Sequence, residues 1–205
     1  MKKIILSLVL ILFVFNGFAH SQQELHKAAH KGDIESVMST STETPSNISG
    51  GHKMTIKITS TAFAEGSMIP KRYSCDAEDV SPDLAWTGVP EGTKSIALIC
   101  DDPDAPMGTW VHWVLFNLPP DISELHAEIP PKKTLKNNAR HGKNDFGKFG
   151  YGGPCPPGGT HRYFFKLYAL DTVINLESGI TKAQLLEAMK GHILDEGQLM
   201  GKYKR

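Results

Sequence analysis

Alternating apolar and polar positions dominate the middle of the chain. Residues 54–59 alternate with a period of two, which is typical of a strand with one buried face. The segment 95–100 is almost entirely apolar and predicts a strand buried on both faces. Residues 109–118 and 161–170 alternate again, with large apolar side chains on both faces, so we predict central strands there. The pattern favours a mainly antiparallel sheet.

The alternation also assigns side chains to the two faces of the strand 109–118. Trp110, His112, Val114 and Phe116 are predicted to share one face, because side chains two residues apart point the same way in a regular strand. In the same way, the later strand is predicted to place His161 beside Tyr163.

Helical spacing is clear near the C-terminus. Thr181 and Gln184 fit a capping box. The apolar positions that follow at helical spacing are Leu185, Leu186, Met189 and Ile193. We expect Gly197 to end this helix and residues 198–203 to form a short final strand or tail. The predicted fold class is therefore mainly β, with a few short helices, one of them near the C-terminus.

Composition is that of one ordinary globular domain. The chain has 205 residues, of which 40% are hydrophobic and 21% are charged. Nineteen glycines and thirteen prolines predict many turns. Acidic and basic residues are equal in number, and no basic stripe is present, so we expect no nucleic-acid partner.

The N-terminus has the pattern of a secretory signal peptide. Lys2 and Lys3 precede an apolar run over residues 4–15, and small residues follow at Ala19 and Ser21. We predict that residues 1–21 are a signal peptide and that the protein is periplasmic or secreted. The apolar run is shorter than the roughly 20 residues that span a bilayer, so no stable membrane insertion is expected after cleavage.

The rest of the chain divides by composition. Residues 22–52 are interpreted as a leader and linker, because 39–51 is rich in Ser, Thr, Asn and Gly. The domain proper is predicted to be 53–205. Three cysteines are an odd number for an oxidising compartment. Cys100 ends an apolar run and is interpreted as a buried hydrophobic residue; if a disulfide forms, we predict Cys75 with Cys155.

Candidate chemistry gathers around one acidic loop and two histidines. Asp102 follows a buried strand directly and begins a loop stiffened by two prolines. His112 and His161 lie on predicted strands, where a buried core histidine is the alternative interpretation. The loop 150–159 is rich in glycine and proline, and we expect it to bring free backbone amides close to a ligand. A long irregular loop would show the same composition.

Four motifs in this order resemble the phosphatidylethanolamine-binding protein family, in its bacterial Raf-kinase-inhibitor-like branch. They are SPDLAW at 81–86, DPDAP at 102–106, WVHW at 110–113 and YGGPCPPGGTHRY at 151–163. The resemblance covers about residues 54–203. It implies a β-sandwich of two antiparallel sheets, with a small pocket at one end.

The resemblance also implies which residues form the pocket and what it binds. The family's pocket falls on Asp102, Trp110, His112, Tyr151, Gly153, Pro156, Pro157, His161 and Tyr163. Expected ligands are phosphate, phosphorylated headgroups or carboxylates, with no metal and no cofactor. Asp102 is expected to accept a hydrogen bond from one histidine and fix its tautomer. The short tail after Tyr203 differs from the eukaryotic lipid-binding members, which makes phospholipid the less favoured ligand.

Alternatives to a binding protein stay open at this point. Asp102, His112 and His161 could serve a cofactor-independent hydrolase as general acid–base groups, although no Gly-x-Ser-x-Gly nucleophile motif is present. The same three side chains form a conceivable metal set. A protease inhibitor using the loop 125–150, and modulation of a protein partner, are further alternatives, as is a homodimer. Enzymatic activity is the less favoured interpretation.

Overall fold

The computed structural model describes residues 56–205. This part of the chain is built mainly from β-strands, with one 3₁₀ helix and one α-helix. The elements in chain order are β1 (Lys57–Thr59), the 3₁₀ helix η1 (Lys71–Tyr73), β2 (Leu84–Thr87), β3 (Ser95–Asp102), β4 (Trp110–Leu118), β5 (Glu124–Leu125), β6 (Arg140–His141), β7 (Thr160–Leu170), α1 (Lys182–Met189) and β8 (Ile193–Lys204). The predicted fold class is confirmed.

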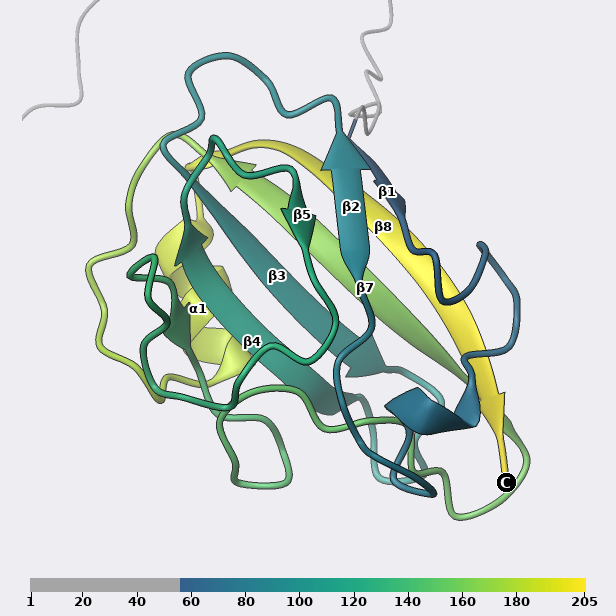
Figure 1. The fold of residues 1–205 in the computed structure, drawn as a ribbon. Coiled ribbons are helices and arrows are strands. Elements are labelled where there is room, and N and C mark those ends of the chain that lie inside the picture. The colour runs from purple at the N-terminus through teal and green to yellow at the C-terminus, as the bar shows by residue number, and fades with distance from the viewer. Residues whose placement is uncertain (1–55) are drawn as a thin grey trace, which may run out of the picture. The chain divides into compact units, whose positions relative to one another are not determined.

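The strands form two antiparallel sheets (Figure 1). The larger sheet has the order β6-β4-β3-β7-β8, and the smaller has the order β1-β2-β5. β3 lies at the centre of the larger sheet and is buried along its whole length, as its continuous apolar run predicts. The long pairing of β7 with β8 extends the sheet on one side of β3.

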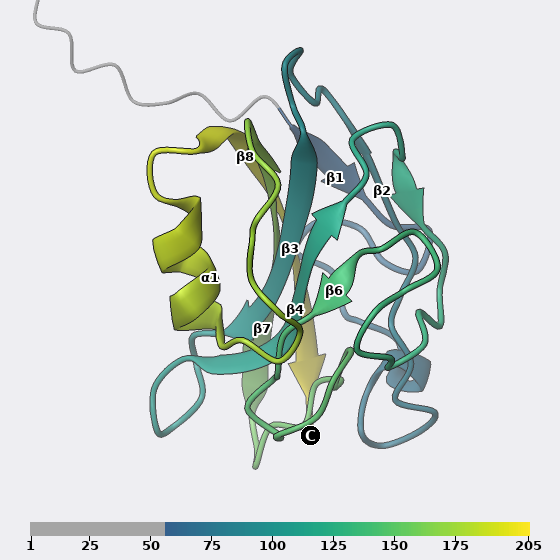
Figure 2. The ribbon, with the colours of Figure 1, turned by 90° about the vertical axis from the view of Figure 1, so that its left-hand side faces the viewer.

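Each face of the larger sheet is covered by a different layer. Figure 2 shows α1 on one face and β1 and β2 on the other. The core between the sheets contains Trp86, Leu98 and Phe165, whereas the core beneath the helix contains Ile99 and Leu185. Fully burying a side chain of this size contributes about 1.5–3 kcal/mol to folding. The two cores therefore hold the larger sheet rigidly between two layers.

The predicted faces of β4 are wrong at the start of the strand, where Val111 rather than His112 packs with Val114 and Phe116. Val114 and Phe116 pack in the core beneath α1, as alternation predicts for a pair two residues apart. His112 does not share their face. Its ring instead meets the ring of Tyr163 edge-on at 5.1 Å, and Tyr163 belongs to the core between the sheets.

A β-bulge in β4 is the cause. Cys100 of β3 pairs with Trp113, but the next residue, Asp101, pairs with Val111. His112 is therefore an extra residue in the ladder, and such an insertion re-aims the side chains beside it. The bulge turns His112 toward the smaller sheet and the end of the sandwich.

The predicted C-terminal helix is confirmed at its start and corrected at its end. Thr181 and Gln184 form the expected reciprocal capping box. The helix ends before Gly191, whose φ of 76° is a conformation that glycine adopts without strain. Ile193 already belongs to β8, and Gly197 lies inside that strand, where a side chain would collide with the chain before β1. The final strand is thus longer than expected.

Several sequence predictions concern the N-terminal part of the chain. The signal peptide (1–21), the leader and linker (22–52) and the start of the domain at residue 53 all lie outside the described residues. Across residues 56–205, the structure contains no helix that is both long and apolar enough to cross a membrane.

Candidate functional site

The candidate site lies where three strands of the larger sheet meet at one edge. β3 ends at Asp102, β4 begins at Trp110 and β7 begins at Thr160. Since β3 is antiparallel to both of its neighbours, its last residues lie beside their first residues. The sheet itself therefore brings Asp102, His112 and His161 together, although they are far apart in the sequence.

These three side chains line a cavity of about 320 Å³. The lining residues are Asp102, Ala105, Pro106, Met107, Trp110, His112, Phe146, Cys155, Pro156, Pro157 and His161. Apart from the carboxylate and the two imidazoles, the walls are almost entirely apolar. A small apolar cavity with a few convergent polar groups is typical of a ligand site, and this one is at the small end of the usual range.

Asp102 and His161 form a buried pair. The His161 Nδ1 lies 2.8 Å from the Asp102 Oδ2, and both side chains are at least nine-tenths buried. The other carboxylate oxygen accepts a hydrogen bond from the backbone N–H of Asp104 at 2.8 Å. A carboxylate only accepts, so Nδ1 of His161 carries the proton and the opposite nitrogen, Nε2, is left for the cavity.

His112 is held by the backbone of the glycine-rich loop. Its Nδ1 lies 2.6 Å from the carbonyl oxygen of Gly152, and the N–H of Gly152 donates to the backbone oxygen of His112 at 2.9 Å. A carbonyl only accepts, so Nδ1 is again the protonated nitrogen. Burial lowers the pKa of His112, and the bond to Gly152 opposes that shift. The ring therefore favours its neutral form, with Nε2 as an acceptor.

Aromatic rings fix the orientation of His112 from both sides. Phe146 meets its ring edge-on at 5.4 Å, and Tyr163 does so at 5.1 Å from the core. Phe146 also packs edge-on against Trp110 at 5.5 Å, which completes one wall of the cavity. Such contacts each add about 0.5–1.5 kcal/mol beyond the area that they bury.

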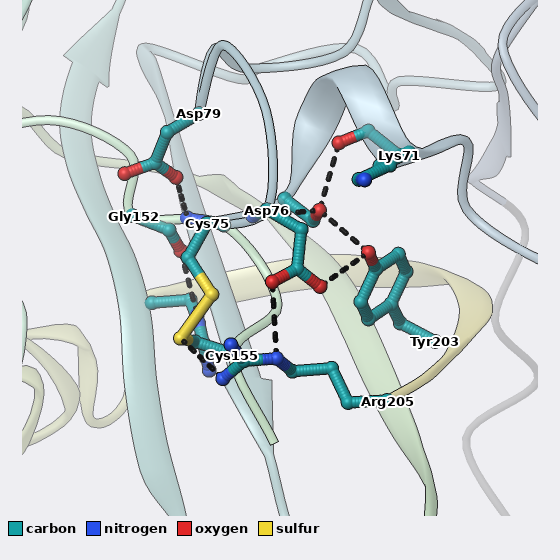
Figure 3. Close-up of a disulfide and its surroundings, with 11 residues drawn as sticks. Lys71, Cys75, Asp76, Asp79, Gly152, Cys155, Tyr203 and Arg205 are labelled. Carbon is teal, nitrogen blue, oxygen red and sulfur yellow. Dashed lines mark hydrogen bonds and ion pairs between the residues drawn. A yellow bond between two sulfur atoms is a disulfide. The ribbon is translucent and has the colours of Figure 1, made fainter. Parts of the chain in front are cut away.

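The predicted disulfide between Cys75 and Cys155 is confirmed (Figure 3). Cys155 is one of the residues that line the cavity. The bond ties the loop that carries Pro156 to the turn after η1. Asp76 of that turn pairs with Arg205 at 3.0 Å. Arg205, which directly follows β8, therefore also stabilises the turn. Cys100 is a buried free cysteine, as expected, and burial raises the pKa of its thiol.

Charged residues near the site point away from the cavity. Asp101 faces the helix side of the sheet, where its carboxylate pairs with Lys166 at 2.9 Å and with Lys182. Asp104 binds Arg162 through a side-chain hydrogen bond, which lowers the pKa of Asp104 to about 2. No lysine or arginine lines the cavity within the described residues, so the histidines are its cationic groups when protonated.

The structure separates the predicted site residues into two sets. Those that line the cavity are Asp102, Trp110, His112, Pro156, Pro157 and His161. Tyr151, Gly153 and Tyr163 lie behind it. The Tyr151 hydroxyl donates to the backbone oxygen of Tyr73 at 2.9 Å, and Tyr163 is fully buried, with its pKa raised by burial. A binding role for any of these residues stays a prediction.

The expectation of free backbone amides in the loop 150–159 is wrong at Gly152 and Gly153. The N–H of Gly153 donates to the Asp79 carboxylate at 2.6 Å, and the N–H of Gly152 is bound to His112. Both amides are therefore used within the fold. The reason is that a glycine-rich loop pressed against neighbouring chain satisfies its donors there, as buried backbone groups must.

Sequence reasoning missed five residues that line the cavity, namely Ala105, Pro106, Met107, Phe146 and Cys155. Met107 and Phe146 are the largest of them. Met107 is 94% exposed at the rim, and Phe146 is 39% exposed. Phe146 stands alone in the polar segment Asn144–Gly147. An isolated aromatic residue in a polar turn is a signal that could have drawn attention to it, whereas a methionine in a loop carries no comparable signal.

The polar side chains of the cavity limit the chemistry that it offers. Its polar side chains are one carboxylate and two imidazoles, which can move protons. The cavity lining holds no serine, no threonine and no free thiol, because Cys155 is in the disulfide. Nowhere in residues 56–205 do three or more His, Cys, Asp or Glu side chains gather in an arrangement able to hold a metal ion.

Comparison with known proteins identifies the family. The family model described as phosphatidylethanolamine-binding protein matches residues 59–204 of this chain. The chain belongs to the phosphatidylethanolamine-binding protein family. A UPF0098 protein of Methanothermobacter thermautotrophicus is 56% identical over 144 residues, which cover 70% of this chain and 95% of that protein.

Two crystal structures of the family have the same fold. A phosphatidylethanolamine-binding protein homolog from Chlamydia trachomatis is 44% identical, with a TM-score of 0.68, and the match covers 75% of this chain and 99% of that one. Escherichia coli YbcL is 32% identical with the same TM-score, and covers 74% of this chain and 99% of its own. Membership in this family implies binding of an anion-type ligand.

Proposed function

We propose that this protein binds a small anion, namely phosphate, a phosphorylated headgroup or a carboxylate, in the cavity between Asp102, His112 and His161. The observation that carries the proposal is the orientation of the two imidazoles. Each Nδ1 is occupied by the fold, on Asp102 or on the Gly152 carbonyl, so that each Nε2 is left for a ligand. Two fixed polar atoms in an otherwise apolar cavity are a preorganised binding site.

The size and walls of the cavity favour a small ligand with an apolar edge. A volume of about 320 Å³ accommodates a phosphate or carboxylate together with a short substituent. Trp110 and Pro157 provide flat apolar walls, and Met107 extends the apolar surface to the rim. A charged headgroup at the histidines with a short chain toward Met107 fits this arrangement.

We propose further that the protein acts in the periplasm or outside the cell. The signal-peptide pattern of residues 1–21 supports export. The disulfide between Cys75 and Cys155 is in keeping with that location, because such bonds persist in oxidising compartments. In a bacterium that makes the full chain, cell fractionation tests this: we expect the shortened protein outside the cytoplasm, and an uncleaved cytoplasmic protein would refute it.

Phosphate-dependent thermal stabilisation tests the binding proposal. A ligand present at about 100 times its Kd stabilises the folded state by about 2.7 kcal/mol, which raises the melting temperature by roughly 5–10 °C for a domain of this size. We expect this shift with the wild-type protein. His161→Ala and His112→Ala should each remove most of it, because each substitution deletes one of the two cavity nitrogens.

A matched control separates binding from general effects on charge. His126 is an exposed histidine that does not line the cavity, with 87% of its side chain accessible. His126→Ala should keep the full phosphate shift. Acetate and phosphoethanolamine, titrated in the same way, distinguish a carboxylate site from a phosphate or headgroup site. An unchanged phosphate shift in both cavity variants would refute the proposal.

A further inference from the structure

The peptide unit between Gly152 and Gly153 is hydrogen-bonded at both ends. Its carbonyl oxygen, on Gly152, accepts from the His112 Nδ1 at 2.6 Å. Its N–H, on Gly153, donates to the Asp79 Oδ1 at 2.6 Å (Figure 3). The Asp79 carboxylate, the peptide and the imidazole therefore form one continuous chain of hydrogen bonds. Consecutive bonds of this kind polarise and strengthen one another.

Asp79 occupies a backbone conformation that its side chain does not favour. Its φ is 56°, in the left-handed region, where glycine is the residue without strain. Aspartate tolerates this region better than most residues, but glycine is the residue that adopts it without cost. Glycine would therefore suit the backbone conformation at this position better than aspartate. What aspartate adds is a carboxylate that accepts the hydrogen bond from the Gly153 N–H.

The surroundings leave no freedom for this peptide to turn away. A side chain at Gly153 would lie 2.3 Å from the Tyr73 backbone oxygen, so the two segments are in direct backbone contact. The Cys75 N–H also donates to the Pro154 oxygen at 3.1 Å, and Cys75 is joined to Cys155. The turn after η1 is therefore fastened to the loop directly after the Gly152–Gly153 peptide.

We infer that Asp79 is a positioning residue for this cavity: through the Gly152–Gly153 peptide it holds His112 with a protonated Nδ1, so that Nε2 faces the ligand as a hydrogen-bond acceptor. Its consequence for ligand selection rests on the proposed anion-binding function. A cavity that offers the acceptors His112 Nε2 and Asp102 selects an oxyanion that carries its own proton. Inorganic phosphate carries such a proton at neutral pH, whereas sulfate, carboxylates and most of a phosphate monoester, whose second pKa is about 6, do not. The inference therefore narrows the proposed ligands to inorganic phosphate.

The first experiment follows the His112 ring directly, in the absence of ligand. In protein with ¹⁵N-labelled histidine, we expect the wild-type Nδ1–H of His112 to exchange slowly with water. Asp79→Gly removes the carboxylate and suits the backbone conformation, and should speed this exchange at least about tenfold, the factor that corresponds to 1.4 kcal/mol. His112→Gln identifies the resonance. Unchanged exchange in a folded Asp79→Gly protein would overturn the inference.

A second variant keeps the test decisive if Asp79→Gly does not fold. Asp79→Asn keeps the size of the side chain and an acceptor oxygen but removes the charge, so we expect at least about threefold faster exchange. An Asp79→Asn protein with wild-type exchange would contradict the role assigned to the carboxylate. Glu78→Gln is the matched control, because it removes a neighbouring exposed acid of the same turn, whose carboxylate pairs with Arg72.

The second experiment compares phosphate with sulfate by calorimetry. We expect the wild-type protein to bind phosphate at least about tenfold more tightly, because an acceptor-lined site leaves groups unpaired with sulfate. Asp79→Gly should reduce this preference at least threefold by weakening phosphate binding. Loss of a nearby negative charge by itself would strengthen the binding of either anion, and Glu78→Gln measures that effect. Weaker phosphate binding in Asp79→Gly therefore indicates lost positioning, whereas stronger binding of both anions indicates a long-range charge effect.

The two experiments fail in different ways. Wild-type protein that binds neither anion would refute the proposed function, while the exchange measurement would still decide whether Asp79 positions His112. Equal affinity of the wild-type cavity for sulfate and phosphate would overturn the selection for a protonated oxyanion.

Discussion

Removing the disulfide is a direct test of how the cavity wall is held. The bond joins Cys75 and Cys155 across 80 residues of sequence, and the closed segment contains β2, β3, β4, β5 and β6. We consider a variant with Cys75→Ala and Cys155→Ala in a Cys100→Ala background. The background change removes the buried free thiol, which could otherwise exchange with the disulfide once the chain unfolds.

The expected magnitude follows from the length of the closed segment. Cross-linking a loop of 80 residues lowers the entropy of the unfolded chain by an amount worth about 4.5 kcal/mol at 25 °C. Residual structure in the unfolded chain reduces this figure, so we expect a loss of about 3 kcal/mol. The folded state should change little, because the Cys75 N–H still donates to the Pro154 oxygen and Gly153 still donates to Asp79.

Urea unfolding measures the effect, with the Cys100→Ala protein as the reference. We expect the free energy of unfolding to fall by about 3 kcal/mol and the urea dependence to rise, since the uncross-linked chain exposes more surface. Reducing the disulfide of the reference protein with a dithiol should give the same loss. A fall below about 1 kcal/mol, with an unchanged urea dependence, would refute the entropic account of this bond.

Two further predictions concern the loop and the buried histidines. Gly153→Ala should destabilise the fold by about 1–3 kcal/mol in the same urea assay, because the new methyl group would lie 2.3 Å from the Tyr73 backbone oxygen. Gly158→Ala is the control: Gly158 has open space around it, so this change should cost less than about 1 kcal/mol. Burial lowers the pKa of His112 and of His141, so the unfolded chain takes up protons first as the pH falls. Their contribution to stability should be complete above about pH 6.5 and decline below it, by up to about 1.4 kcal/mol per pH unit for each histidine, and a free energy of unfolding that does not fall between pH 7 and 5.5 would contradict this.

The strands, and which of them is buried on both faces, were predictable because both depend on the local pattern of apolar and polar residues. The apolar run before Asp102 predicts a strand buried on both faces, and the structure places it at the centre of the larger sheet. The capping box at Thr181 depends on two residues three apart and is confirmed. The face of His112 was not predictable, because a bulge depends on how two strands pair. The apolar and polar pattern of β4 itself carries no sign of the bulge.

The amides of the glycine-rich loop show the same limit. Composition correctly places a loop of close backbone contacts beside the histidines, but it cannot say which group accepts each N–H. Asp79, more than seventy residues earlier in the chain, accepts the N–H of Gly153, and only the folded chain brings the two together.

The amino-acid sequence by itself predicted the antiparallel β fold from hydrophobic period. Four motifs, through their family resemblance, predicted that Asp102, His112 and His161 share one pocket. For the disulfide the sequence supported only a conditional prediction, that Cys75 would pair with Cys155 if a bond formed. Tertiary structure alone decided which ring nitrogens face the cavity, which loop amides are already bound, and where Phe146 completes the wall. The physical reason is that hydrogen bonds and ring contacts between distant segments depend on register and packing, and neither is encoded in any local stretch of sequence.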